Sequence, residues 1–253
     1  MIQKIKVGAV SYLNTKPLVY GFEHGLMQEE IDLSFDYPAN VARQLLNDEI
    51  DVGLVPVAVL PMMENYHIIS DYCIGAEGPV ASVCLFSDVP LEDISEVLMD
   101  YQSRTSVALL KILLAEHWKI KPVLTAAVKG FEEQIKGTTA GLVIGDRAFA
   151  QRQRSKYIYD LADAWKQMTG LPFVFAVWAS NKKLPVAFTD KFNLVTGEGL
   201  QHIDSIVTQQ QYTAYDLSMY YTQNISYNLS ETKKEALALF QKFLKSAPEK
   251  ISS

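Results

Sequence analysis

The sequence predicts an α/β fold of two lobes, in which mixed sheets are flanked by helices and a ligand cleft lies between the lobes. Strand-like and helical segments alternate through the first half, which is typical of largely parallel sheets covered by helices. Strand signals end near Ala179, and long helical stretches begin after Leu184. We expect this helical tail to pack back on the first lobe, because it is unlikely to form a core alone.

The first lobe rests on the N-terminal segments. Its expected strands cover residues 4–10, 31–37, 52–55 and 67–74, and its expected helices cover residues 16–26 and 40–47. Pro17 stands in the first turn of the earlier helix, where a missing N–H has no cost.

The second lobe begins after Gly78-Pro79. Its expected strands cover residues 80–86, 97–99, 123–126, 140–144 and 173–179, and its expected helices cover residues 104–118 and 160–168. The tail helices are expected at residues 186–210, 212–223 and 232–244, the last with a Thr232-x-x-Glu235 capping box. Lobe 1 is therefore predicted to combine residues 1–80 and 181–253, and lobe 2 to be residues 81–180. Two chain crossings near residues 80 and 180 would form a hinge that lets a binding protein close on its ligand.

Composition excludes several classes of protein. The 253 residues carry a net charge of −6 without a basic run, so nucleic acid is not an expected partner. No apolar stretch approaches the roughly 20 residues that span a bilayer, and the N-terminus does not resemble a signal peptide. We therefore expect a cytoplasmic protein without membrane contact, as a monomer or homodimer. Cys73 and Cys84 lie in apolar strand-like runs and are expected to be buried, reduced thiols.

A polar cluster, Ser11-Tyr12-Leu13-Asn14-Thr15-Lys16, follows the first strand. Ligands of open parallel sheets sit beyond the carboxyl ends of the strands, which makes this cluster a candidate binding segment. The alternative is a routine strand-to-helix turn, with Asn14 or Thr15 as the helix N-cap.

A second candidate is the segment Ser103-Arg104-Thr105-Ser106, which precedes a strongly helical run. Its three hydroxyls, its guanidinium and the N–H groups of a helix start are suited to a carboxylate or phosphate. Ser106 occupies the position of the capping-box acid, so no internal carboxylate competes for those donors. Ordinary N-capping with a solvated Arg104 is the alternative.

Three further segments are weaker candidates. Ser82 lies in a hydrophobic strand, Gly145-Asp146 follows another strand, and Phe175 and Trp178 belong to an aromatic-rich run. A satisfied core hydroxyl, a helix N-cap and core packing are the respective alternatives. The sequence lacks the phosphate-binding, metalloprotease, serine-hydrolase and dinucleotide motifs, and its four histidines are not clustered. The residues alone thus indicate a two-lobed anion binder, with no cofactor expected and the reaction undetermined.

Several long motifs occur together in one order along the chain. They are VGAVSYLNTKPL at residues 7–18, DVGLVPVAVL at 51–60, GPVASVCLFSDVPLEDI at 78–94, SRTSVALLKILL at 103–114, LVIGDRA at 142–148 and DLADAWKQMTGLPFVFAVWA at 160–179, with a looser match at ISYNL, 225–229. Together they resemble the menaquinone-biosynthesis enzymes of the MqnA/MqnD family, and within it the chorismate dehydratases.

The resemblance implies a periplasmic-binding-protein-like fold of the second type, which fits two chain crossings. It also implies a hydro-lyase of the futalosine route, which removes water from chorismate to give 3-[(1-carboxyvinyl)oxy]benzoate. The related cyclic futalosine-derivative lyases carry a His in the region of Ile144-Gly145-Asp146, so its absence here favours the dehydratase. A non-catalytic solute-binding protein is the alternative of a different class, and the missing signal peptide weighs against it.

The resemblance gives the candidate residues roles toward a dianionic substrate. Arg104, with the Ser103–Ser106 segment, would hold one carboxylate, and Asn14 and Ser82 would orient the reacting carbons. The base would be either Asp146 or, as we favour, the enolpyruvyl carboxylate of the substrate, because Asp146 has a competing capping role. The remaining predicted contacts line the cleft: Tyr12, Gly145, Phe175 and Trp178.

Overall fold

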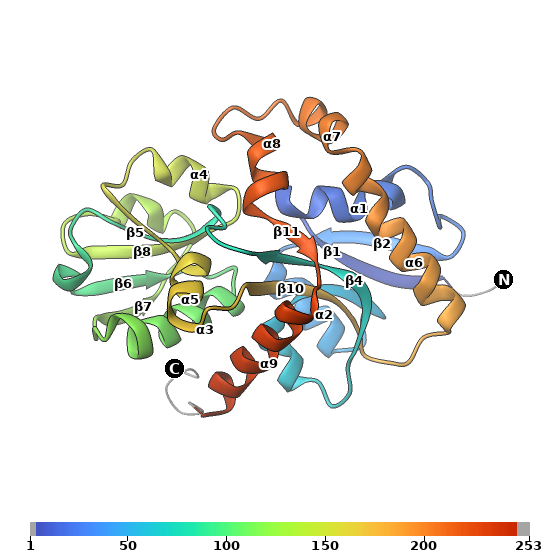
Figure 1. Cartoon of the computed structure of the whole chain (residues 1–253), viewed down its shortest axis with the longest axis horizontal. Helices are drawn as coiled ribbons and strands as arrows, with labels where there is room; N and C mark the ends of the chain where they lie inside the picture. The colour runs from blue at the N-terminus through green and yellow to red at the C-terminus, as the bar shows by residue number, and fades with distance from the viewer. Residues whose placement is uncertain (1–3, 247–253) are drawn as a thin grey trace. The chain divides into compact units, whose positions relative to one another are not determined.

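The structure is a computed structural model that describes residues 4–246 (Figure 1). The chain forms two compact units, with divisions after Gly75, before Val174 and after Glu231. Unit 1 thus contains the N-terminal segment and the segment from Val174 to Glu231, whereas unit 2 contains the segment between them and the last helix. Each unit has its own sheet, and each is described separately below.

Unit 1 is built on a six-stranded sheet with the order β11-β4-β10-β3-β1-β2. Its strands are β1 (Ile5–Val10), β2 (Ile31–Asp36), β3 (Val52–Pro56), β4 (His67–Ala76), β10 (Phe173–Ser180) and β11 (Ser226–Asn228). β1 runs parallel to β2 and β3, whereas β10 is antiparallel to β3, and β11 to β4. The sheet is therefore mixed, as predicted.

Helices of unit 1 are α1 (Lys16–Glu23), α2 (Pro38–Leu46), α6 (Val186–Glu198), α7 (Ile203–Gln210) and α8 (Leu217–Met219), the last continued by a π-helical turn at Tyr220–Asn224. Trp178 of β10 is fully buried, and its ring lies edge-on to Phe192 of α6 at 5.1 Å and to Phe22 of α1 at 6.4 Å. These aromatic contacts join the sheet to helices from both chain segments of unit 1.

Unit 2 has a five-stranded sheet with the order β7-β6-β8-β5-β9. Its strands are β5 (Val83–Ser87), β6 (Glu96–Met99), β7 (Val123–Ala126), β8 (Thr139–Ile144) and β9 (Tyr157–Asp160). Its helices are α3 (Thr105–Ile112), continued by a π-helical stretch to Trp118, α4 (Arg147–Arg152), α5 (Leu161–Thr169) and α9 (Glu231–Ser246). β6 is parallel to β7 and β8, and β5 is antiparallel to β8 and β9.

Several expectations about local structure were wrong. The strand expected from residue 80 begins at Val83, because Ala81 adopts a left-handed conformation with φ of 65°. The tail contains a strand, β11, and the single helix expected at residues 186–210 is interrupted around Gly199. Thr232 lies inside α9 and is not its N-cap. The short strand β9 was not anticipated, and α4 was anticipated only as the helix that Asp146 would cap.

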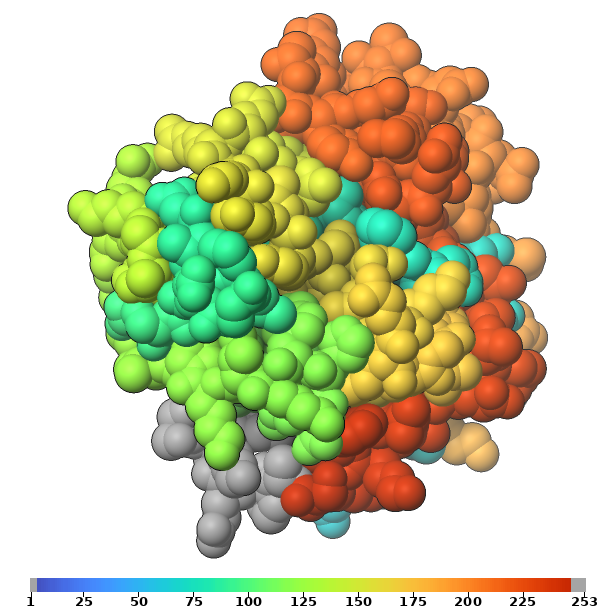
Figure 2. All heavy atoms as spheres, turned by 60° about the vertical axis from the view of Figure 1, so that its left-hand side comes forward, coloured from blue at the N-terminus to red at the C-terminus, as the bar shows by residue number. Residues whose placement is uncertain are grey.

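The last helix also differs from expectation, because it belongs to unit 2 and not to the first lobe. Its Phe240 is buried, with ring centroids 5.1 Å from Phe173 and 6.1 Å from Trp165. Figure 2 shows α5, in gold, beside the red α9 on the surface of this unit. The apolar face of α9 thus packs on the aromatic residues Trp165 and Phe173 of unit 2. Its amphipathic pattern predicts that this face is buried but does not predict which residues bury it. The hinge near residues 80 and 180 stays a prediction.

Cys73 and Cys84 are both free and buried, as predicted. Within residues 4–246, no helix combines the length and the apolar character that a membrane-spanning helix needs.

Candidate functional site

Three predicted site segments meet at one edge of the unit 2 sheet. Because β6 and β8 are parallel, with Leu98 opposite Gly141, their carboxyl ends reach the same edge. β5 is antiparallel to β8, with Val83 opposite Ile144, so its amino end lies at that edge too. Tertiary structure therefore gathers Ser82, the residues after β6 and the turn after β8 into one candidate site.

The turn after β8 contacts the turn before β5 directly. Gly145 has a φ of 65°, and its N–H donates to the carbonyl of Ser82 at 2.8 Å. Ser82 is fully buried, and its own N–H donates to the carbonyl of Val80 at 2.8 Å. Two predicted site residues, distant in the chain, are thus linked by a backbone hydrogen bond.

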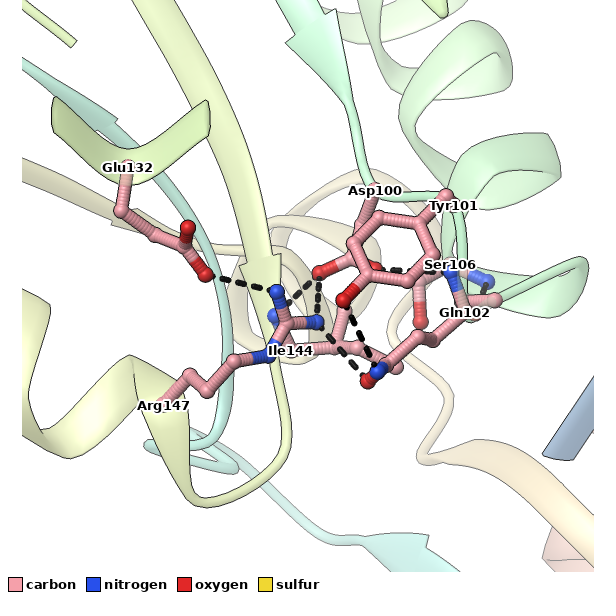
Figure 3. A network of polar contacts seen from close by, with 8 residues as sticks. Asp100, Tyr101, Gln102, Ser106, Glu132, Ile144 and Arg147 are labelled. Atoms are coloured by element: carbon pink, nitrogen blue, oxygen red, sulfur yellow. Dashed lines mark hydrogen bonds and ion pairs between the residues drawn. The ribbon is translucent and has the colours of Figure 1, made fainter. Parts of the chain in front are cut away.

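Asp100, directly after β6, is a site residue that the sequence analysis missed (Figure 3). One carboxylate oxygen accepts from the Arg147 guanidinium at 2.6 Å and from the Ile144 N–H at 3.1 Å, and the other accepts from the Gln102 N–H at 2.9 Å. Burial raises the pKa of Asp100, although Arg147 and the two N–H groups oppose this shift. This one side chain ties together the ends of β6 and β8 and the start of α4.

Arg147, which projects from α4, completes this network. Its guanidinium also donates to Glu132 at 2.6 Å and to the side-chain oxygen of Gln102 at 3.0 Å, and lies 5.3 Å from the ring centre of Tyr101 and 5.9 Å from that of Phe131. With two carboxylates against one guanidinium, the network does not provide net positive charge for an anionic ligand. Arg147 therefore organises the edge of the sheet. The available sequence signals were an Asp immediately after one strand, β6, and an Arg at the start of the helix after another strand, β8.

The start of α3 only partly matches the predicted anion site. The Ser103 hydroxyl accepts from the Ser106 N–H at 3.0 Å, so a side chain of the segment already uses one helix-start donor. Thr105 and Ser106 are buried, whereas Arg104 is exposed. Of the four predicted residues, Arg104 is thus the one that is both charged and exposed, as the predicted contact to a carboxylate requires.

Asp146 lies between Gly145 and α4 and is half-buried. Although it stands at the N-cap position of α4, its side chain makes no capping hydrogen bond to that helix. The prediction that the Asp146 side chain caps this helix, which was our argument against Asp146 as the base, is therefore wrong.

The remaining predicted residues belong to unit 1. Asn14 lies in a short 3₁₀ turn, Leu13–Thr15, and is largely buried. Its backbone carbonyl accepts from the hydroxyl of Tyr227 on β11 at 3.0 Å. Burial raises the pKa of Tyr227 well above its usual value, followed in size by the effect of Tyr220 and Tyr221, so the phenol remains a neutral donor.

A small cavity of about 120 Å³ adjoins the same turn. It is lined by residues that follow or flank β1: Val10, Ser11, Tyr12, Thr15, Lys16, Val19, Glu23 and Phe35. Lys16 forms an ion pair with Glu23 at 3.2 Å. The predicted contact Tyr12 therefore borders a cavity within unit 1.

The two aromatic candidates of β10 lie in the interior of unit 1. Phe175 retains 7% exposure, and Trp178 is fully buried against Phe22 and Phe192. Trp178 is thus a core residue of unit 1, which was the alternative that the sequence left open to a place in the cleft wall. Among residues 4–246, no group of three or more His, Cys, Asp or Glu side chains is arranged to hold a metal ion.

Comparison with solved structures defines the class of fold. The chain is similar to a protein of Archaeoglobus fulgidus, with a TM-score of 0.74 and 17% identity over 97% of this chain and 98% of that one. It is also similar to the periplasmic aliphatic sulphonate binding protein SsuA of Escherichia coli, with a TM-score of 0.62 and 13% identity over 98% and 93% of the two chains. A Candida albicans protein described as having the generic periplasmic binding protein fold gives a TM-score of 0.58 and 13% identity over 97% and 95%. The fold is that of the periplasmic binding proteins.

Comparison of sequences gives the family. The model of the menaquinone biosynthesis family matches residues 5–246, and the chain belongs to that family. It is also 29% identical over 261 aligned positions to the chorismate dehydratase of Thermus thermophilus, covering 94% of both chains. The family resemblance of the motifs is thereby confirmed.

Proposed function

We propose that this protein is a chorismate dehydratase, a lyase that eliminates water from chorismate to give 3-[(1-carboxyvinyl)oxy]benzoate for menaquinone biosynthesis. The observation that carries this proposal is the similarity to the Thermus thermophilus chorismate dehydratase along 94% of both chains. Residues 144–146, where the cyclic futalosine-derivative lyases were expected to carry a His, are Ile-Gly-Asp. This sequence feature favours the dehydratase over that lyase.

The chemistry requires little of the protein beyond orientation and proton transfer. Loss of the C4 hydroxyl and the C3 hydrogen makes an aromatic ring, and aromatisation drives the reaction. Arg104, exposed at the start of α3, would hold one substrate carboxylate through a charge-assisted hydrogen bond. Ser82 and Asn14 would orient the reacting carbons, since correct placement of the reacting groups supplies much of the rate.

Two groups are candidates for the base that removes the C3 proton. Asp146 is half-buried, follows Gly145 of the Ser82–Gly145 contact, and does not cap α4 through its side chain. These observations make Asp146 a stronger candidate for the base than the sequence alone did. The enolpyruvyl carboxylate of the substrate would instead act within the bound molecule. Because the capping argument against Asp146 no longer applies, both groups stay candidates for the base, and Gly145, with its φ of 65°, shapes the turn beside Asp146.

The activity test is incubation of the purified protein with chorismate, followed by ultraviolet absorbance and mass of the product. We expect an aromatic enol ether to form without added metal or nucleotide. Loss of activity on adding a chelator, restored by a divalent ion, would contradict the cofactor-free proposal. No consumption of chorismate, with tight binding of an amino acid or sugar, would support a solute-binding protein.

The base is decided by single-turnover rates at saturating chorismate. If the substrate carboxylate acts, Asp146→Asn retains most activity, whereas Ser82→Ala and Asn14→Ala are slower because they lose an orienting group. If Asp146 acts, Asp146→Asn loses about 10²–10⁴-fold while it still binds substrate. Melting temperatures of all three variants establish that each is folded.

We also propose a cytoplasmic location, which suits a biosynthetic enzyme of this family, and a monomer or homodimer in solution. Sedimentation equilibrium of the purified chain distinguishes the two oligomeric states. Cell fractionation with an antibody against the protein tests the location.

A further inference from the structure

Asp160, the last residue of β9, accepts hydrogen bonds from two separate segments of unit 2. One carboxylate oxygen accepts from the N–H groups of Ala162 and Asp163, at 3.1 and 3.2 Å, and thereby caps α5. The same oxygen accepts from the Val80 N–H at 3.1 Å, and the other oxygen accepts from the Ala81 N–H at 2.8 Å. A helix N-cap usually serves its own helix, so the two bonds to the turn before β5 need a separate explanation.

That turn holds an unfavourable backbone conformation. Ala81 has a φ of 65°, in the region where a β-carbon clashes with the backbone, and no glycine relieves it. The carbonyl of Ala81 accepts from the Arg152 guanidinium at 3.2 Å. Charged groups thus bind both the N–H and the carbonyl of the same strained residue.

The next residue in the chain is Ser82, and its placement follows from this turn. Ser82 is fully buried, and its carbonyl accepts the Gly145 N–H at 2.8 Å. If the Asp160 bonds were lost, Ala81 would relax toward negative φ and the peptide that leads into Ser82 would rotate. The direction of the Ser82 side chain and its contact with Gly145 would then change.

We propose that Asp160 is a positioning residue for Ser82, which it directs by holding Ala81 in the left-handed conformation. This inference rests on the proposed function, in which Ser82 orients the reacting part of chorismate. Asp160 does not contact the substrate in this account. Its effect passes through the backbone from Ala81 to Ser82, and Arg152 supports the same turn.

Asp160→Asn separates the positioning role from helix capping. Its amide oxygen can replace the carboxylate oxygen that caps α5, and Asn is as good an N-cap as Asp. Its NH₂ group then replaces the oxygen that accepted the Ala81 N–H. Because both groups are donors, the hydrogen bond is lost and the two groups repel each other. The variant is therefore expected to keep α5 and to release the turn.

The activity test uses a double-mutant cycle with Ala81→Gly. Asp160→Asn is expected to lower kcat roughly 10- to 100-fold with little change in KM, because a displacement of about 1 Å costs roughly 10²-fold. Ala81→Gly alone should stay within a few fold of wild type. In the double variant it should restore kcat several-fold, since glycine adopts positive φ without a steric clash. Purely additive effects would show that Asp160 does not act through Ala81, and would overturn the proposal.

Two measurements keep this test independent of folding and of the assigned reaction. Asp216 caps α8 of unit 1 through the Met219 N–H at 3.0 Å, so Asp216→Asn is a capping control that should leave kcat unchanged. Hydrogen exchange followed by mass spectrometry should show faster exchange at residues 80–82 in Asp160→Asn, with α5 still protected. Unchanged exchange there would overturn the proposal. Failure of the wild type to consume chorismate would instead reject the proposed function, while faster exchange would still support the role of Asp160 in the turn.

Discussion

The two polar turns that carry Asn14 in unit 1 and Ser82 in unit 2 are both buried beside a strand, but they are held in different ways. Neutral groups hold the Asn14 turn: the Thr15 N–H donates to the Tyr12 carbonyl at 3.1 Å, and the Tyr227 hydroxyl donates to the Asn14 carbonyl at 3.0 Å. Charged groups hold the edge of unit 2 that contains Ser82.

Two buried carboxylates of unit 2, Asp100 and Asp160, each bind several partners at this edge. Asp160 accepts four backbone N–H groups, and Asp100 accepts two backbone N–H groups and the Arg147 guanidinium. Hydrogen bonds to charged groups are about twice as strong as neutral ones, and removal of a buried ionic partner leaves an uncompensated charge. We therefore expect the unit 2 edge to be the more sensitive of the two regions to a single substitution.

The largest effect is expected from Asp100→Ala. Removal of this fully buried carboxylate leaves Arg147 without one of its anionic partners and two N–H groups without an acceptor, which should cost about 3–5 kcal/mol of unfolding free energy. Asp51→Ala in unit 1 is the matched control. Its carboxylate pairs with Lys182 and is 22% exposed, so water can replace part of what is lost. Equal losses in urea unfolding would remove the distinction between the two regions.

An intermediate effect is expected from Arg104→Ala. This substitution tests whether a charged side chain of unit 2 also contributes to substrate binding. Chorismate affinity should fall about 10- to 150-fold, because a hydrogen bond to a charged group contributes about 1.5–3 kcal/mol. The melting temperature should hardly change, since Arg104 is exposed. Arg154→Ala, which removes an exposed arginine paired with Glu133 in the same unit, should not affect affinity. A large loss of melting temperature with normal affinity would instead make Arg104 structural.

The smallest effect is expected from Tyr227→Phe, which removes the neutral anchor of Asn14 and keeps the ring. The buried Asn14 carbonyl then loses its hydroxyl donor, which should cost about 1–2 kcal/mol of unfolding free energy and lower kcat modestly. Tyr215→Phe is the control, because the Tyr215 hydroxyl donates to the Asn224 side chain at 3.1 Å. A similar loss of kcat in both variants would mean that Tyr227 does not act through Asn14.

Local sequence pattern determined much of the secondary structure and the segments that carry the candidate site. The hydrophobic runs of β1 and β3 and the Pro17 helix start lie where the sequence predicts them, because backbone preference and periodicity act within a few residues. Ser82, Ser103–Ser106 and Gly145–Asp146 could be chosen because polar residues follow or precede strands, and the ends of neighbouring strands meet at one edge. The order of the long motifs was likewise sufficient to predict the family.

The contacts that hold those segments depend on long-range pairs that appear only in the folded chain. The bond from the Val80 N–H to Asp160 spans 80 residues, that from Tyr227 to Asn14 spans 213, and that from Arg147 to Asp100 spans 47. No local pattern encodes such pairs, since an Asp before a helix looks like an N-cap whether or not a distant turn also binds it. The same limit applies to α9, whose apolar face packs with Trp165 and Phe173. Sequence determines which faces must be buried, whereas the assembled fold determines which partner buries them.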